Sequence, residues 1–217
     1  IKNNLNYSFI KKNIKLKIKN KAFFILNKIN LLFSFNRKTN IFLLKTYFNK
    51  STEISLSKKI NGFSSFWYDN QISENDFKKI DKSKKRDFKI KIDKNDLSFK
   101  TLIISLIEKN IPYLYLENFS DLINLTRNSP WPKNPKKILT SESYLYDEMF
   151  KCYSGLNTEN GTKLFLYQIG GGIDSMKFSF VRDHVISISD KYVTWGWNDR
   201  NYENIRPLGI QKTYNIN

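Results

Sequence analysis

Apolar residues recur at helical spacing in two neighbouring segments near the middle of the chain. The first ends where Pro112 limits further helix, and the second runs from there to residue 128. The first pattern contains Leu97, Leu102, Ile103, Leu106 and Ile107. The second contains Leu114, Leu116, Phe119, Leu122, Ile123 and Leu125. We therefore predict two packed helices.

Beyond a proline-rich connection, residues 136–143 read KKILTSES, which predicts a short apolar strand ending at Thr140 and Ser141. Residues 144–156 are amphipathic and predict a helix, with Ser143 as its N-cap and Gly155 near its end. The sequence KLFLYQ then predicts a second strand that runs into three glycines. This order of strand, helix and strand is typical of a parallel sheet, whose ligands bind at the carboxyl ends of the strands.

Further strands are expected on both sides of this unit. The alternation in HVISISDKYVTWG indicates one or two strands, and NIRPLGI indicates another, closed by Gly209. Near the start, IFLLKTYF predicts a strand or buried turn, and the following segment a short helix that ends at Gly62. We interpret the charge-dense residues 71–91 as a solvated loop or exposed helix, with a phosphate-binding patch as the weaker alternative.

These patterns predict an α/β fold, a Rossmann-like parallel sheet flanked by helices. We divide the chain into a poorly defined basic segment (1–38), a mostly helical part (39–130) and a βαβ Rossmann-like part (131–217). Residues 21–35 are too short and too polar for a membrane span, and indicate a core helix or strand pair. Because the chain begins with Ile1 and no signal peptide follows, we expect a partial chain.

The net charge of +17 first suggests a polyanionic partner. Lysine supplies most of this charge, however, and rises together with Asn, Ile and Phe, as expected when a genome is rich in A and T. Arginine, which makes the forked contacts to phosphate and guanine, occurs only six times. We therefore expect no nucleic acid, and keep a basic nucleic-acid-binding protein as the weaker alternative.

Single copies of cysteine and histidine limit the chemistry. Cys152 alone excludes an internal disulfide, and His184 alone excludes a site with several histidines. We expect no bound metal and no cofactor. No Ser-His-Asp arrangement is evident. His184 is the only histidine that could act as its base, and the side chain of the adjacent Asp183 would point in a different direction on a strand or a helix.

Residues 168–197, QIGGGIDSMKFSFVRDHVISISDKYVTWGW, depart most from the bulk composition. A triplet of glycines costs backbone entropy, so it indicates a sharp turn or a close approach of a ligand to the backbone. The spacing matches neither G-x-G-x-x-G nor a Walker sequence. A tight turn without a ligand stays an open alternative at this point.

The segments ILTSESYLYDEMFKCYSGLNTENGTKLFLYQIGGG and ISDKYVTWGWNDRNYENIRPLG resemble a family of bacterial transferases of surface carbohydrate biosynthesis. Those proteins look like GT-B glycosyltransferases, with two facing Rossmann-like domains. The resemblance covers roughly residues 40 to 210 and is most specific in the Asp-x-Tyr-x-Thr-Trp-Gly-Trp string. It implies one GT-B-type domain and the start of a second, with the domain expected to hold the donor nucleotide further on.

The resemblance implies a cytoplasmic glycosyltransferase that uses a nucleotide-sugar donor and a glycan or lipid-linked acceptor. Peripheral contact with the inner membrane surface is a further expectation. Where the family has His in Gln-His-Gly-Gly, this chain has Ile169, which cannot take a proton. An inactive remnant or carbohydrate-binding fragment is therefore the main alternative.

The candidate site residues follow from these patterns. Asp190 and His184 are the candidates for acid or base, although turn capping and a structural role are their alternatives. Arg182 and Arg206 are candidates for phosphate contacts. Trp195 and Trp197 could stack on a sugar; the alternative is that they pack in the hydrophobic core and at its edge. Thr140, Ser141, Gln168, Gly170, Gly171 and Gly172 complete the predicted binding edge.

Overall fold

A computed structural model describes residues 39–64, 77, 91, 98–129 and 131–210 of the chain. The expectations for residues 1–38, and those for nearly all of residues 71–91, lie outside the described residues. The chain divides into two compact units, one formed by residues 71–128 and the other by the remainder.

The larger unit is built on a sheet of six parallel strands in the order β2-β1-β3-β4-β5-β6. The strands are β1 (Ile41–Leu44), β2 (Gly62–Ser64), β3 (Lys137–Thr140), β4 (Lys163–Tyr167), β5 (Lys191–Thr194) and β6 (Ile205–Pro207). The predicted α/β fold with a Rossmann-like parallel sheet is confirmed. Residues 39–64 contribute two of these strands, β1 and β2, although the predicted division of the chain assigned them to the mostly helical part.

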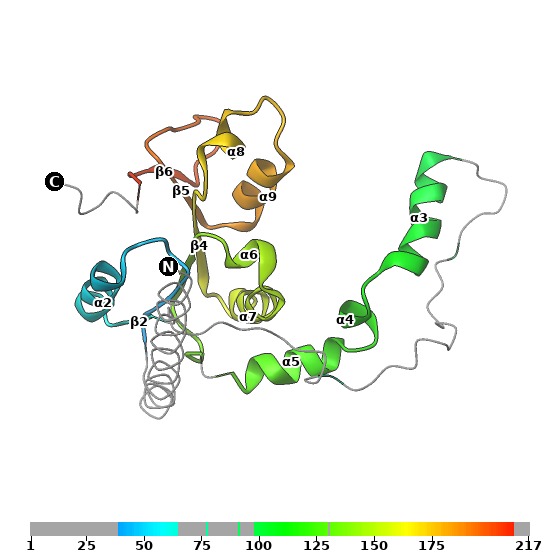
Figure 1. Ribbon diagram of the computed structural model, residues 1–217, viewed down its shortest axis with the longest axis horizontal. Coiled ribbons are helices and arrows are strands. Elements are labelled where there is room, and N and C mark those ends of the chain that lie inside the picture. The colour runs from blue at the N-terminus through cyan, green and yellow to red at the C-terminus, as the bar shows by residue number, and fades with distance from the viewer. Residues whose placement is uncertain (1–38, 65–76, 78–90, 92–97, 130, 211–217) are drawn as a thin grey trace, which may run out of the picture. The chain divides into compact units, whose positions relative to one another are not determined.

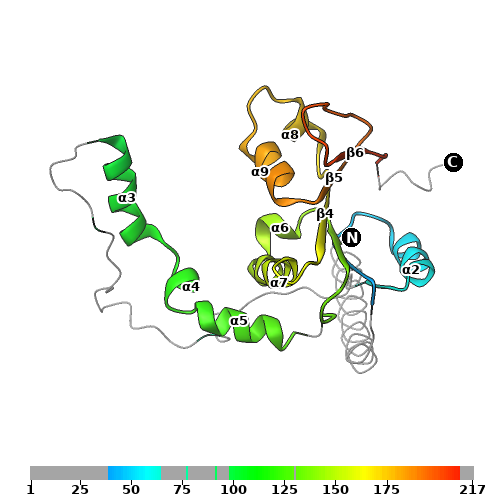
Figure 2. The same cartoon turned by 180° about the vertical axis from the view of Figure 1, so that it is seen from behind.

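Helices cover both faces of the sheet. Figures 1 and 2 show α2 (Lys50–Lys59) on one side, with α6 (Ser143–Tyr146), α7 (Glu148–Thr158) and α9 (Phe180–Ile188) on the other. The chain follows β1 with a helix on one face and β3 with helices on the opposite face. In such a doubly wound sheet the crevice for ligands opens at the carboxyl ends of these two neighbouring strands.

Alternate strand residues form two hydrophobic layers, one on each face. On the face of α7, the buried Phe42 ring packs against the rings of Trp131 and Tyr153, with centroids 5.5 and 5.2 Å away. On the face of α2, the core contains Leu43, Leu139, Tyr167 and Val193, with Leu56 of the helix packed against it. These layers hold the strand ends in register.

The smaller unit contains three described helices, α3 (Phe99–Asn110), α4 (Tyr113–Leu116) and α5 (Phe119–Arg127). The first predicted helix is confirmed, and Ser98 caps it. The second predicted helix is two, because the chain leaves helical hydrogen bonding between Leu116 and Phe119.

Three predictions in the larger unit were wrong. The single helix at residues 144–156 is α6 and α7, because the Asp147 side chain accepts a hydrogen bond from the Phe150 amide (2.9 Å) and starts a new helix. The segment HVISI belongs to helix α9, not to a strand. The predicted early helix is present as α2 and only its end was wrong, because it stops at Lys59 and Gly62 begins β2.

Candidate functional site

The carboxyl edge of the sheet brings together most of the predicted binding residues. Thr140 and Ser141 end β3, the Gln168 turn follows β4, and the Trp-Gly-Trp string follows β5. The strands pair in register here, with Leu44 opposite Thr140 and Tyr167 opposite Val193. Polar side chains after adjacent parallel strands therefore share one edge.

The Gln168 side chain ties two of these segments together. Its amide oxygen accepts hydrogen bonds from the Trp195 backbone N–H (2.8 Å) and the Trp197 indole N–H (3.0 Å). Its NH₂ group donates to the Gly170 carbonyl (3.0 Å). Because Gln168 is buried and these bonds occupy both ends of its amide, it fixes the glycine turn against the tryptophan string.

The glycine triplet lies at the end of β4, where Gly171 begins the short helix α8 (Gly171–Ser175). None of the three glycines has a positive φ angle. A Cβ atom added at Gly170 or Gly172 would meet nothing within 4 Å, and one at Gly171 would make only an ordinary contact with the Trp195 ring at 3.9 Å. The fold of the described residues thus does not require glycine at these positions.

Gly196, in contrast, has a φ of +111°, a conformation that other residues rarely adopt. It lets the chain reverse between two half-buried tryptophans. Trp197 packs edge-on against Tyr192, with centroids 6.0 Å apart, and the Thr194 hydroxyl donates to the Trp197 carbonyl. The Trp195 indole N–H is buried and has no partner among the described residues.

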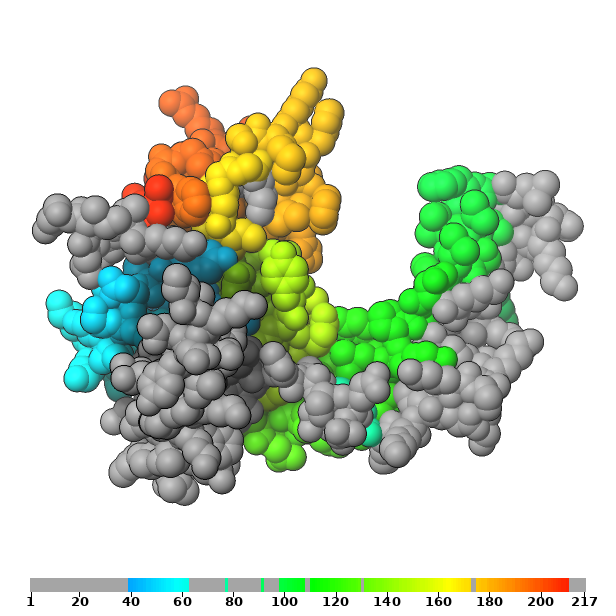
Figure 3. Space-filling model, in the orientation of Figure 1, coloured from blue at the N-terminus to red at the C-terminus, as the bar shows by residue number. Residues whose placement is uncertain are grey.

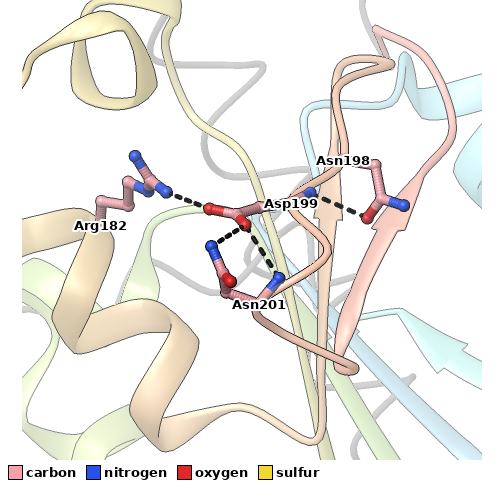
Figure 4. Close-up of polar contacts among 4 residues, drawn as sticks. All are labelled: Arg182, Asn198, Asp199 and Asn201. Atoms are coloured by element: carbon pink, nitrogen blue, oxygen red, sulfur yellow. Dashed lines mark hydrogen bonds and ion pairs between the residues drawn. The ribbon is translucent and has the colours of Figure 1, made fainter.

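An ion pair joins α9 to the loop after the tryptophan string (Figure 4). Arg182 Nη2 lies 2.7 Å from Asp199 Oδ2, while the other Asp199 oxygen accepts from the backbone N–H (3.0 Å) and side-chain amide (2.9 Å) of Asn201. The Arg182 guanidinium also lies 5.5 Å from the Trp197 ring centroid. These contacts give Arg182 a bracing role, and leave its use for phosphate a prediction.

The whole chain, residues 1–217, matches the sequence model described as LIC12162 family transferase. The chain belongs to the LIC12162 family of transferases. No curated protein and no solved structure matches it. The family name agrees with the transferase predicted from the sequence resemblance, and leaves its donor, acceptor and cellular role to proposal.

Asp190 lies at the opposite edge of the sheet of this transferase. It directly precedes β5, and its carboxylate accepts from the Leu164 backbone N–H (2.9 Å) and pairs with Lys163 (2.8 Å) at the start of β4. Burial alone would raise the pKa of Asp190, but these bonds and nearby lysines lower it below its ordinary value. The structure does not bring Asp190 together with the glycine turn, and the contacts favour the turn-capping alternative.

His184 lies on α9 and has no contact with the glycine turn among those described. It is exposed on α9 and lines an open groove of about 560 Å³ with residues from α6 and α7 such as Tyr144, Lys151 and Ser154. No hydrogen bond from its ring to another described residue holds it in place, as an imidazole base would require. Its catalytic role stays a prediction without support from its neighbours.

Two further positions complete the predicted set. Arg206 is exposed on the edge strand β6, and its Nη1 donates to the neighbouring Ile205 carbonyl (2.9 Å). Ile169 is half-buried between Gln168 and Gly170, so the position that carries histidine in the resembled family lies within the turn itself.

Sequence reasoning missed two residues at the carboxyl edge, Tyr47 and Glu142. The Tyr47 hydroxyl donates to Glu142 Oε2 over 2.5 Å, although the residues are 95 positions apart. No motif spans such a distance, and the signal was only that each follows a strand.

The described residues contain no cluster of three His, Cys, Asp or Glu side chains suited to a metal. Nor does any described helix have the length and apolar character to cross a bilayer.

Proposed function

We propose that this LIC12162 family transferase is a glycosyltransferase of surface polysaccharide assembly. It transfers a sugar from a nucleotide-sugar donor to a glycan or lipid-linked acceptor in the cytoplasm. The larger unit is one of two Rossmann-like domains of a GT-B enzyme, and its carboxyl edge faces the reactants.

The observation that carries this proposal is the bare backbone at Gly170 and Gly172. Folding does not explain these glycines, since neither has a positive φ nor a close neighbour. A ligand that approaches the backbone does explain them. In sugar transfer the donor diphosphate leaves with its charge, and backbone N–H groups directed at it stabilise that charge.

An exposed apolar segment supports a lipid-linked acceptor. Met176 and Phe178 lie between α8 and α9 and Phe180 begins α9, and these three side chains are 51%, 83% and 86% exposed. The Lys177 ammonium lies 5.5 Å from the Phe178 ring centroid, so a basic group accompanies the aromatic side chains. Figure 3 shows yellow and orange side chains of this part of the chain extending away from the surface. Apolar side chains with a lysine are suited to the interface of an anionic membrane.

The experiment is nucleotide release from a panel of UDP-, GDP- and dTDP-sugars, measured for this chain and its variants together with the second Rossmann-like domain that the proposal requires. Gly170→Ala leaves folding intact, because the added Cβ atom meets nothing within 4 Å, but it obstructs the backbone and lowers turnover at least tenfold. Gly155→Ala on α7 is the control, since that glycine also has open space around it. Absence of turnover with every donor would refute the proposal. Loss only in Gly155→Ala would move the site to the α7 groove.

Ile169 favours a second candidate, a carbohydrate-binding remnant without catalysis, because no imidazole is present at the glycine turn. Ile169→His separates the two. Turnover that appears only in the variant supports the remnant, whereas turnover by the natural sequence excludes it.

A further inference from the structure

The carboxyl ends of β1 and β3 bring together a carboxylate, Glu142, and a phenol, Tyr47, that no predicted role uses. β2 flanks β1 on one side and β3 flanks it on the other, and the helices after β1 and β3 lie on opposite faces of the sheet (Figure 1). The helices that follow the two strands therefore diverge, while the backbone N–H of Ser141 donates to the Lys45 carbonyl (3.0 Å) and keeps the two strand ends together. This is the position at which doubly wound sheets bind ligands.

The segment after β1 has an unusual backbone. Lys45 and Tyr47 have φ angles of +47° and +62°, in the left-handed region that large side chains seldom enter. Such residues persist where the surrounding structure holds them, and they concentrate at functional sites. The neighbouring Phe48 ring packs edge-on against Tyr167 at the end of β4, with centroids 6.0 Å apart. The segment is thereby fixed beside the glycine turn.

This backbone brings the Tyr47 phenol to the half-buried Glu142 carboxylate, 2.5 Å from Oε2. Burial, and then the hydrogen bond to Glu142, raise the pKa of Tyr47 to about 12. The phenol therefore keeps its proton at neutral pH and donates it. Among the described residues no donor reaches the second carboxylate oxygen, Oε1, which leaves it able to accept a hydrogen bond from a ligand.

Unused polar groups surround this pair. The hydroxyls of Thr46, Ser141 and Ser143 are at least 99% buried and have no partner among the described residues. Folded proteins normally satisfy such groups, so three of them on residues next to Tyr47 and Glu142 indicate a polar ligand that rearranges them when it binds. A carboxylate beside hydroxyls repels an anion and accepts from a neutral hydroxyl group, which makes a sugar or polyol the fitting class of ligand.

We propose that the carboxyl ends of β1 and β3 bind the acceptor hydroxyl, with Glu142 as the general base and Tyr47 as its positioning residue. The inference rests on the proposed glycosyl transfer. The acceptor oxygen forms a bond to the anomeric carbon while that carbon's bond to the donor phosphate oxygen breaks. The hydroxyl proton passes to Glu142 Oε1, and the nucleotide diphosphate leaves with the electron pair. Glu142 follows β3, the neighbour of the strand that leads to Gly170, so base and leaving group would lie on adjacent strand ends.

The test compares Glu142→Gln and Tyr47→Phe with Glu148→Gln. The control residue is also a hydrogen-bonded glutamate, paired with Lys151 at 2.7 Å on α7. With the donor panel, Glu142→Gln lowers kcat about 100-fold or more, the usual contribution of a general base, and leaves donor binding unchanged. Tyr47→Phe removes the hydrogen bond that orients the carboxylate, so it lowers kcat and leaves the KM for the acceptor unchanged. Glu148→Gln changes neither.

A second measurement keeps this inference separate from the proposed function. Saturation-transfer NMR with methyl hexopyranosides reports binding of sugar hydroxyls without any donor. Binding by the natural chain that Glu142→Ala abolishes and Glu148→Ala preserves supports the acceptor site, even if no donor turns over and glycosyl transfer is rejected. Unchanged turnover in Glu142→Gln, or absence of glycoside binding by the natural chain, overturns the inference.

Discussion

Replacement of Gln168 by leucine tests whether this side chain holds the carboxyl edge together. The two side chains are similar in size, so the main change is loss of three hydrogen bonds: from the Trp195 amide, from the Trp197 indole and to the Gly170 carbonyl. A buried polar group left without a partner costs about 1–3 kcal/mol. Trp195, Trp197 and Gly170 are only half-buried and water replaces part of each bond, so about 1 kcal/mol each is the appropriate value.

The sum is about 3 kcal/mol, and the added apolar burial of leucine offsets about 1 kcal/mol. The free energy of unfolding should therefore fall by about 2 kcal/mol, which lowers Tm by about 4–8 °C in a chain of this size. Urea denaturation followed by tryptophan fluorescence, with thermal melting by circular dichroism, measures both quantities. Asn160→Leu is the matched control, because that amide makes one exposed hydrogen bond, to the Leu156 carbonyl.

The control should change stability by no more than about 0.5 kcal/mol. If Gln168→Leu is as stable as Asn160→Leu, Gln168 does not join the glycine turn to the tryptophan string. The reasoning that places both segments at one rigid site would then be refuted.

Two further predictions concern charge and membranes. The pKa of Asp190 is lowered in the folded state, so the carboxylate stabilises the fold fully above its ordinary pKa of 3.8, and this stability is lost as the pH falls through the lower folded-state pKa. In Asp190→Asn the free energy of unfolding, measured as a function of pH, should lack this loss at acidic pH. A profile identical to that of the natural chain would contradict the contacts described. The double variant Phe178→Ser, Phe180→Ser should sediment with anionic vesicles at least fivefold less than the natural chain. The control Tyr202→Ser, which removes a partly exposed aromatic ring elsewhere, should sediment as the natural chain does. Equal sedimentation of the double variant and the control would remove the membrane contact from the proposal.

The sequence predicted the centre of this fold because its strands are short apolar runs between clear helix and turn signals. KILT and KLFLY are such runs, and they are the paired strands β3 and β4. The break at Asp147 was missed although an aspartate before Glu148 is a good cap, because the apolar pattern continues across it. Tertiary packing, which buries Met149 and Phe150 in succession, sets the direction of α7.

The segment HVISIS misled prediction because its β-branched residues alternate with polar ones. In the structure Val185 and Ile186 are buried side by side on α9, and the Ser179 side chain caps the helix by accepting from the Arg182 amide (3.2 Å). Once this segment is a helix, Asp190 stands at a helix-to-strand turn. That turn belongs to the amino edge of a parallel sheet, which explains why Asp190 is separated from the glycines.

The Tyr47 and Glu142 pair could not be read from the sequence for a different reason. Its two residues meet only because β1 and β3 are neighbours, and β2 and the smaller unit lie between them along the chain. Strand order, not local pattern, creates this part of the site. The glycine triplet, in contrast, was visible at once, and the structure removed the fold-based explanation of Gly170 and Gly172.

The most direct test of the central claim is to map ligand contacts along the chain by ¹H–¹⁵N NMR. Nucleotide sugars are titrated into this chain together with the second Rossmann-like domain that the proposal requires, and the backbone amide shifts of the chain are followed. The account predicts that the largest changes occur at Gly170, Gly171 and Gly172 and extend to Glu142. Changes confined to the groove around His184 on α9, or no change with any nucleotide sugar, would contradict it.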